Sequence, residues 1–100
     1  MVSLSVAVVN ELGMHARAAA KFVHLAARFE SRIRVGARGR EMDGKSIMGL
    51  LLLAAARGTS VTISAEGPDE ADAVHALGLL VSSGFGEGDD APAGAEGGAR

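Results

Sequence analysis

A histidine and an arginine stand two residues apart in the stretch Gly13-Met14-His15-Ala16-Arg17 of this 100-residue chain, and both side chains can take part in chemistry. His15 stands where a polar loop meets an Ala-rich segment with helical periodicity, and Arg17 follows two residues later. A helix N-terminus offers free backbone N–H groups and the positive end of the helix dipole, and both favour an anion. Together with the Arg17 guanidinium, they predict a histidine placed to carry or meet an anion the size of phosphate.

A second interpretation of His15 stays open from the residues alone. A histidine before a helix is commonly a surface residue or a cap, and a short glycine-histidine-arginine pattern does not by itself compel an anion site. The other two histidines offer weaker candidates. His24 falls in the middle of the expected helix, away from free N–H groups, and is expected on the surface, and His75 is assigned no role.

Two runs of the chain together resemble the HPr family, the histidine-containing phosphocarrier proteins of the bacterial phosphoenolpyruvate-dependent sugar phosphotransferase system. The first run is Gly13 to Ala20, and the second is Gly44-Lys45-Ser46-Ile47-Met48-Gly49-Leu50. The similarity in element order extends from about Val2 to about Gly86. The resemblance implies that His15 accepts a phosphoryl group from phosphorylated enzyme I, with Arg17 stabilising its charge. His15 would then pass that group to a histidine of a sugar-specific enzyme IIA.

The second run implies a regulatory site and a docking surface. In the family Ser46 is a regulatory phosphorylation site in bacteria that possess the matching kinase, an HPr kinase/phosphorylase. From its position Ser46 also suits the N-cap of the helix that follows. That helix has more apolar residues than one face can bury, so part of its apolar surface is expected to be exposed for partner binding. The residues expected to dock partners are Lys21, Lys45, Ile47, Met48 and Leu51.

One departure from the family pattern widens the choice of functions. The family usually has proline directly after the arginine, and this chain has Ala18. The first function is a phosphocarrier in sugar uptake, and the second is a specialised paralogue acting as a regulatory binding module in a nitrogen-related or other phosphorelay. The third is an interaction domain with an idle histidine, against which His15 and Arg17 argue. In the first two the protein is a reactant in a relay rather than an independent enzyme, and it needs no cofactor or metal.

Composition and charge limit the other possibilities. The absence of cysteine excludes disulfides and thiolate metal sites. The N-terminus lacks the pattern of a signal peptide, and the longest apolar run, Leu50 to Ala56, is far shorter than the roughly 20 residues that cross a bilayer. We therefore expect a soluble, cytoplasmic monomer. Residues 1–86 hold nine basic and eight acidic residues, with every base at or before Arg57. One side is thus expected to be locally positive and to suit acidic protein partners.

A basic hairpin raises the alternative of nucleic-acid binding, since it carries Arg32, Arg34, Arg38 and Arg40. The chain has no tyrosine or tryptophan to stack on bases, and residues 1–86 carry far less net positive charge than a nucleic-acid-binding domain. Charges on an edge strand also prevent aggregation, which accounts for the arginines. Nucleic acid is not expected as a partner.

The order of predicted elements is β-α-β-β-α-β-α. Alternating apolar residues predict strands at about 2–8, 31–35, 40–43 and 60–65, and helical spacing predicts helices at about 16–29, from 47 onward and from about 69 to 83. This order predicts an α+β fold in which helices cover one face of a four-stranded, largely antiparallel sheet. The resemblance adds the open-faced β-sandwich with three helices on one face. Residues 1–86 form the expected domain, and 87–100 are expected to be a disordered, acidic Gly/Ala-rich tail.

Overall fold

The computed structural model describes residues 1–86, so the disorder predicted for 87–100 lies outside the described residues and stays a prediction. The predicted element order is confirmed. The elements are β1 (Val2–Ala7), α1 (Ala16–Ala26), β2 (Arg32–Ala37), β3 (Arg40–Asp43), α2 (Ile47–Leu53), β4 (Ser60–Glu66), α3 (Glu70–Ser82) and a final 3-10 turn, η1 (Gly84–Gly86).

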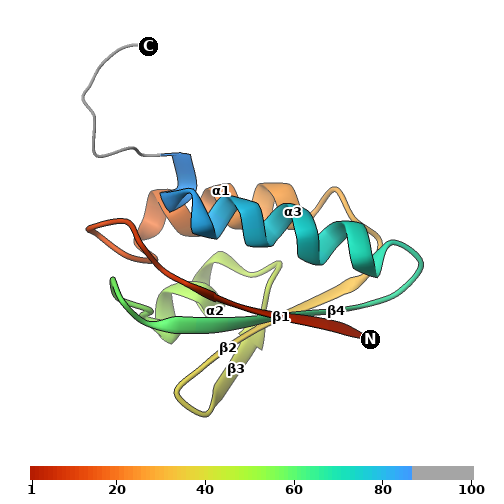
Figure 1. Cartoon of the computed structure of the whole chain (residues 1–100), viewed down its shortest axis with the longest axis horizontal. Coiled ribbons are helices and arrows are strands. Elements are labelled where there is room, and N and C mark those ends of the chain that lie inside the picture. Colours follow the sequence, from red (N-terminus) through yellow and green to blue (C-terminus); the bar gives the residue numbers. More distant parts are fainter. Residues whose placement is uncertain (87–100) are drawn as a thin grey trace.

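The four strands form one antiparallel sheet in the order β1-β4-β2-β3. In Figure 1, α1 and α3 lie side by side above the sheet, and α2 packs against α1 and β3. The predicted open-faced β-sandwich, with three helices on one face of a four-stranded sheet, is confirmed. Within the described residues, no helix is both long enough and apolar enough to cross a membrane.

The core lies between the sheet and the helices. Alternate residues of the two central strands, β2 and β4, point toward the helices and are fully buried, as period-two alternation predicts. They meet the apolar stripe of α1 and the buried side chains of α3. These residues are Ile33, Val35, Val61 and Ile63 from the strands, Ala19, Phe22 and Ala26 from α1, and Leu77 and Val81 from α3. Leu4 faces Gly78 of α3 but is 41% exposed, because β1 is an edge strand.

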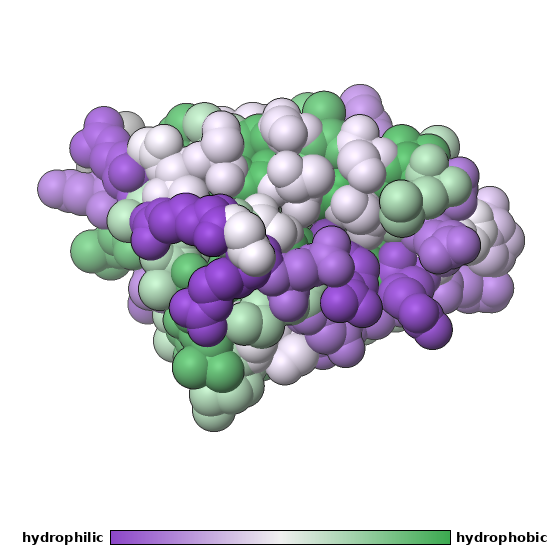
Figure 2. Space-filling view, turned by 90° about the horizontal axis from the view of Figure 1, so that it is seen from below, coloured by the Kyte–Doolittle hydropathy of each residue, from purple (hydrophilic) through white to green (hydrophobic). Residues whose placement is uncertain are grey.

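The outer face of the sheet is polar. Hydroxyl groups pair across β1 and β4, with Ser3 Oγ 3.0 Å from Ser64 Oγ. Figure 2 views the molecule from below, where near-white residues border a band of hydrophilic ones, with hydrophobic residues at the lower corner and along the upper edge. Arg34 of the basic hairpin forms an ion pair with Glu41 on the neighbouring strand at 3.2 Å. For Arg34, this ion pair supports a role within the sheet rather than in nucleic-acid binding.

The end of α1 differs from the prediction. The helix ends at Ala26 rather than near Phe29, because the N–H groups of Arg28 and Phe29 bond to the carbonyl three residues back and tighten the chain into turns. The next two N–H groups, of Glu30 and Ser31, bond to the carboxylate of Asp69 at 2.9 and 3.0 Å. Asp69 thus occupies the N–H groups that would continue the helix. Helical periodicity cannot predict this contact, because it joins residues far apart in the sequence.

Candidate functional site

The loop before α1 fixes the position of His15. Asn10 Nδ2 donates to the Gly13 carbonyl at 2.7 Å, and the Met14 N–H donates to the Ala55 carbonyl at 2.9 Å. The Met14 side chain is buried, and Gly13 adopts a φ of +68°, a conformation that suits glycine. The backbone directly before His15 is therefore fixed by hydrogen bonds at both Gly13 and Met14.

His15 is the N-cap of α1. Its backbone is extended, with φ −81° and ψ −179°, and its Nδ1 accepts a hydrogen bond from the Arg17 N–H at 3.2 Å. A ring nitrogen that accepts an N–H presents its lone pair rather than a proton. The lone pair of Nδ1 therefore points at the N-terminal turn of α1, where the helix dipole favours negative charge.

A hollow of about 530 Å³ opens beside this imidazole and is lined by Leu12, His15, Arg17, Lys21 and Gly86. Among the described residues of its lining, Arg17 and Lys21 carry full charges, and both are cationic. Lys21 Nζ donates to the Phe85 carbonyl at 2.8 Å, which ties the C-terminal turn η1 to α1. The structure thus brings His15, Arg17 and Lys21 of the predicted site together, in a place suited to a phosphate-sized anion.

Ser46 is the N-cap of α2, as predicted, and its Oγ accepts the Gly49 N–H at 3.0 Å. The apolar residues that follow are divided between core and surface. Ile47 and Met48 are exposed, by 38% and 66%, whereas Leu51 is half-buried and packs against the core. The prediction that part of this apolar run is exposed is confirmed for Ile47 and Met48, whereas Leu51 faces the core.

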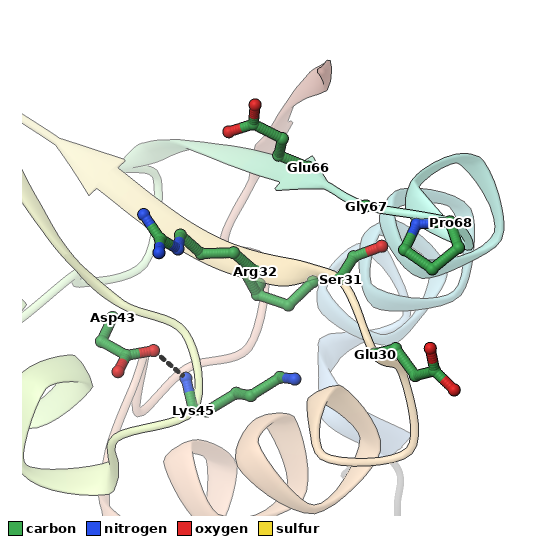
Figure 3. Close-up of a pocket in the computed structure, with 9 residues that line it drawn as sticks. Glu30, Ser31, Arg32, Asp43, Lys45, Glu66, Gly67 and Pro68 are labelled. Carbon is green, nitrogen blue, oxygen red and sulfur yellow. Dashed lines mark hydrogen bonds between the residues drawn. The ribbon is translucent and has the colours of Figure 1, made fainter.

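Lys45 lies apart from the lining of the His15 hollow. Its Nζ donates to the Phe29 carbonyl at 2.7 Å, beyond the end of α1, and its N–H donates to Asp43 Oδ1 at 2.9 Å. Figure 3 shows Lys45 beside Asp43 in a second hollow, between the start of β2 and the end of β4. Through its hydrogen bond to the Phe29 carbonyl, Lys45 joins the loop before α2 to the chain after α1.

Sequence reasoning missed three residues of this region. Leu12 is 72% exposed and lines the His15 hollow, and Leu52 is 55% exposed on α2. Gly86 also lines the hollow, although it lies 71 residues after His15 in the chain. The sequence could have indicated Leu12, because an apolar residue within a polar loop is unusual. Nothing in the sequence indicates Gly86, because only the folded chain brings it there.

The described residues contain no group of three or more histidine, cysteine, aspartate or glutamate side chains that could hold a metal ion. From the part of the chain that the structure describes, the hollow has an imidazole lone pair, backbone N–H groups and the cationic side chains of Arg17 and Lys21. These groups suit the transfer of an anionic group onto and off the ring.

Comparison with known proteins identifies the family. A family model described as the PTS HPr component phosphorylation site matches residues 2–83. The chain belongs to the HPr family. The HPr model covers α1, α2 and the whole sheet, so the match includes both His15 and Ser46.

Individual members of the HPr family match most of this chain in sequence and share its fold. The chain is 45% identical over 89 residues to phosphocarrier protein HPr of Cupriavidus necator and also to that of Neisseria meningitidis, covering 89% of this chain and 100% of each relative. Among solved structures, HPr from Thermoanaerobacter tengcongensis is 42% identical with a TM-score of 0.84, covering 87% of this chain and 98% of that one.

Proposed function

We propose that His15 is the phosphoryl-accepting residue, receiving the group from enzyme I and passing it to a histidine of an enzyme IIA. As a member of the HPr family, this protein is a phosphocarrier of the phosphotransferase system. The observation that carries the assignment to His15 is its Nδ1, which accepts the Arg17 N–H and points at the N-terminus of α1. The lone pair that would form the new bond thus lies beside the groups that would stabilise the transferred charge.

The transfer itself needs only groups that this hollow holds. The Nδ1 lone pair of His15 attacks the phosphorus of the donor phosphohistidine, the N–P bond of the donor breaks, and its electron pair stays on the donor imidazole. Nδ1 gives up its hydrogen bond from the Arg17 N–H, which then donates to a phosphoryl oxygen. The Arg17 guanidinium and the Lys21 ammonium stabilise the charge on the group in flight. Attack by the acceptor imidazole reverses these steps.

Exposed apolar side chains in the hollow and on α2 supply the docking surface for both partners. Leu12 lies in its lining, and Ile47, Met48 and Leu52 are the exposed residues of α2. Such a surface is typical of protein interfaces, and methionine adapts to more than one partner. One shared surface requires that the carrier leave enzyme I before it meets the enzyme IIA, which is what a relay needs. The expected monomeric state stays a prediction.

The test of this proposal is to locate the phosphate and follow it onward. The protein is incubated with phosphoenolpyruvate, magnesium and enzyme I. The phosphorylated protein is then digested and its peptides are mapped by mass spectrometry under alkaline conditions, in which phosphohistidine is stable. We expect acid-labile phosphate on the peptide that contains His15, and its loss when an enzyme IIA is added. Phosphate on another peptide would contradict the assignment. Phosphate that stays on His15 with every enzyme IIA would favour the regulatory paralogue.

We propose Ser46 as a second, regulatory phosphorylation site. Its hydroxyl is only half-buried, and it stands directly before the exposed Ile47 and Met48. A phosphate there would place negative charge within the docking surface and repel an acidic enzyme I. The comparison of Ser46→Asp with Ser46→Asn isolates the charge, because both residues can cap the helix. We expect slower phosphotransfer from enzyme I for Ser46→Asp, and equal rates for the two variants would count against this role. An HPr kinase/phosphorylase as partner rests on this proposal.

A further inference from the structure

The turn that joins β2 to β3 borders a hollow of about 360 Å³, which we call the hairpin hollow. Its lining includes Gly36, Arg38, Arg40, Glu41, Ser60 and Thr62. Because β3 is an edge strand, the hollow lies at the margin of the sheet (Figure 1). Four residues stand opposite one another in a row across the outer face: Ser5, Thr62, Gly36 and Glu41. Gly36 has no side chain, so the row has a gap between Thr62 and Glu41, where the hollow forms.

The side chains around this gap offer hydrogen-bond donors. Because β2 and β4 are antiparallel, Arg38 and Ser60 stand at the same end of the gap. Arg38 is exposed and forms no ion pair with another described residue, and it donates to Thr59 Oγ1 at 3.1 Å with one amino group, which leaves other N–H groups of its guanidinium available. The Ser60 hydroxyl is exposed and bonds to no other described residue. Glu41, an acid in the lining, is already balanced by its ion pair with Arg34.

The turn holds Arg38 in a strained backbone conformation. Ala37 pairs with Arg40, so the turn has two central residues, Arg38 and Gly39, and their φ angles are +52° and +79°. Turns with two positive φ angles favour asparagine followed by glycine, because asparagine tolerates the left-handed conformation better than a long side chain does. The geometry of the turn therefore does not account for an arginine. Strained residues of this kind cluster at ligand-binding sites, which directs attention to the guanidinium.

We propose that the hairpin hollow binds the phosphate group of a small molecule, with the Arg38 guanidinium and the hydroxyls of Ser60 and Thr62 as its donors. The planar guanidinium donates to two oxygens of a phosphate, and a hydroxyl can donate to a third, which a carboxylate lacks. Arg40 adds a second positive charge to the lining. This inference goes beyond the phosphocarrier role, because the described lining residues of this hollow and of the His15 hollow do not overlap.

Free phosphate and a phosphate monoester share this chemistry, and titrations of the full chain followed by NMR distinguish them. The ligands are inorganic phosphate, glycerol phosphate and acetate, at an ionic strength held constant with sodium chloride. The amides of Gly36 and Thr62 report the hairpin hollow, and the amide of Arg17 reports the His15 hollow. We expect saturable shifts at Gly36 and Thr62, with a dissociation constant of about 1–10 mM for the better phosphate ligand and binding of acetate at least about threefold weaker.

The variant Arg38→Asn separates the guanidinium from the geometry of the turn. Since asparagine suits this turn, the variant should melt about 2–5 °C above wild type without ligand. It should also bind phosphate at least about fivefold more weakly, because the charged donor is gone. The matched control is Arg32→Asn, which removes the same charge at the start of β2, in the lining of the second hollow (Figure 3). This control should shift the Gly36 amide with phosphate as wild type does.

The proposal requires weaker binding and a higher melting temperature in the same variant. Equal phosphate affinity of Arg38→Asn and wild type would overturn it. Shifts that grow linearly and equally with phosphate and with chloride would overturn it too, because phosphate would then act only through ionic strength. Acetate that binds as tightly as both phosphate ligands would overturn the assignment to a phosphate group. None of these results depends on phosphorylation of His15.

Discussion

At the scale of single residues, Gly13 shows how strictly the backbone before His15 is specified. A Cβ at this position would come within 2.6 Å of the Ala55 carbonyl oxygen and 3.0 Å of Ala56 Cα, and the φ of +68° disfavours any other residue. Both contacts are to backbone, so neither can move aside as a flexible side chain could. The position of His15 therefore depends on the absence of a side chain two residues before it.

The variant Gly13→Ala is expected to lose about 3 kcal/mol of unfolding free energy, from the positive φ and the backbone clash together. Gly39→Ala is the matched control, since Gly39 has a φ of +79° and a Cβ added to it would meet nothing within 4 Å. It is expected to lose only about 1 kcal/mol. Urea unfolding measures both values. Equal losses for the two variants would mean that the contact with the segment at Ala55 does not constrain the loop.

The cap at Ser46 gives a second residue-scale prediction. Because its Oγ accepts the Gly49 N–H at 3.0 Å, Ser46→Ala should lower the free energy of unfolding by about 1 kcal/mol. Ser46→Asn keeps an acceptor at the same place and is expected to stay within a few tenths of a kcal/mol of wild type. Thermal unfolding compares the two variants. An alanine variant as stable as the asparagine variant would show that the Ser46 side chain does not stabilise α2 as an N-cap.

At the scale of elements, three polar contacts join segments that are distant in the sequence. Asp69 binds the chain between α1 and β2, Lys45 binds the Phe29 carbonyl, and Lys21 binds the Phe85 carbonyl. Each uses a charged group to satisfy backbone groups where an element ends, and such hydrogen bonds are stronger than neutral ones. The order of elements alone does not specify these contacts, and they hold the helix ends in place on the sheet.

The Asp69 contact predicts an acid-sensitive part of the stability. The Ser31 hydroxyl, the Glu30 N–H and the Ser31 N–H donate to this carboxylate and hold its pKa below the ordinary value of 3.8. A lowered pKa means that the stabilisation is present above 3.8 and is lost as the pH falls through the lower folded value. Wild type should therefore exceed Asp69→Asn in melting temperature at pH 6, and the difference should narrow as the pH falls below 3.8.

The control for this pH dependence is Asp72→Asn, which removes an exposed carboxylate from the first turn of α3 and leaves the Asp69 contact in place. Its melting temperature relative to wild type should change less between pH 6 and pH 2 than that of Asp69→Asn. A difference between wild type and Asp69→Asn that stays constant with pH would show that the contact does not depend on the charge of the carboxylate.

These element-scale contacts also mark how far sequence reasoning could go. Alternation in 60–65 and helical spacing around Phe22 predicted the layers and the core, because burial imposes those periods on the sequence. The N-cap at Ser46 was readable because capping is local. The position of Gly86 beside His15 and the early end of α1 were not readable, since both depend on contacts between residues far apart in the chain.

At the scale of the whole molecule, one layer of helices packs on one face of one sheet, so the described residues 1–86 share a single core. Phe22 is fully buried within it, between α1 and the sheet. Phe22→Ala is expected to cost about 3–5 kcal/mol, a large part of the roughly 5–15 kcal/mol typical of a domain. Urea unfolding measures the loss. Phe22→Leu, which keeps most of the buried volume, should lose less, and equal losses would contradict this description of the core.

Intact-mass spectrometry after incubation with phosphoenolpyruvate, magnesium and enzyme I shows whether this HPr protein carries its phosphoryl group on His15. Wild type, His15→Ala and His24→Ala are compared, the last being an exposed histidine on the same helix. We expect one added phosphoryl group on wild type and on His24→Ala, and none on His15→Ala. Phosphorylation of His15→Ala to the same extent as wild type, or no phosphorylation of wild type by a cognate enzyme I, would contradict the assignment to His15.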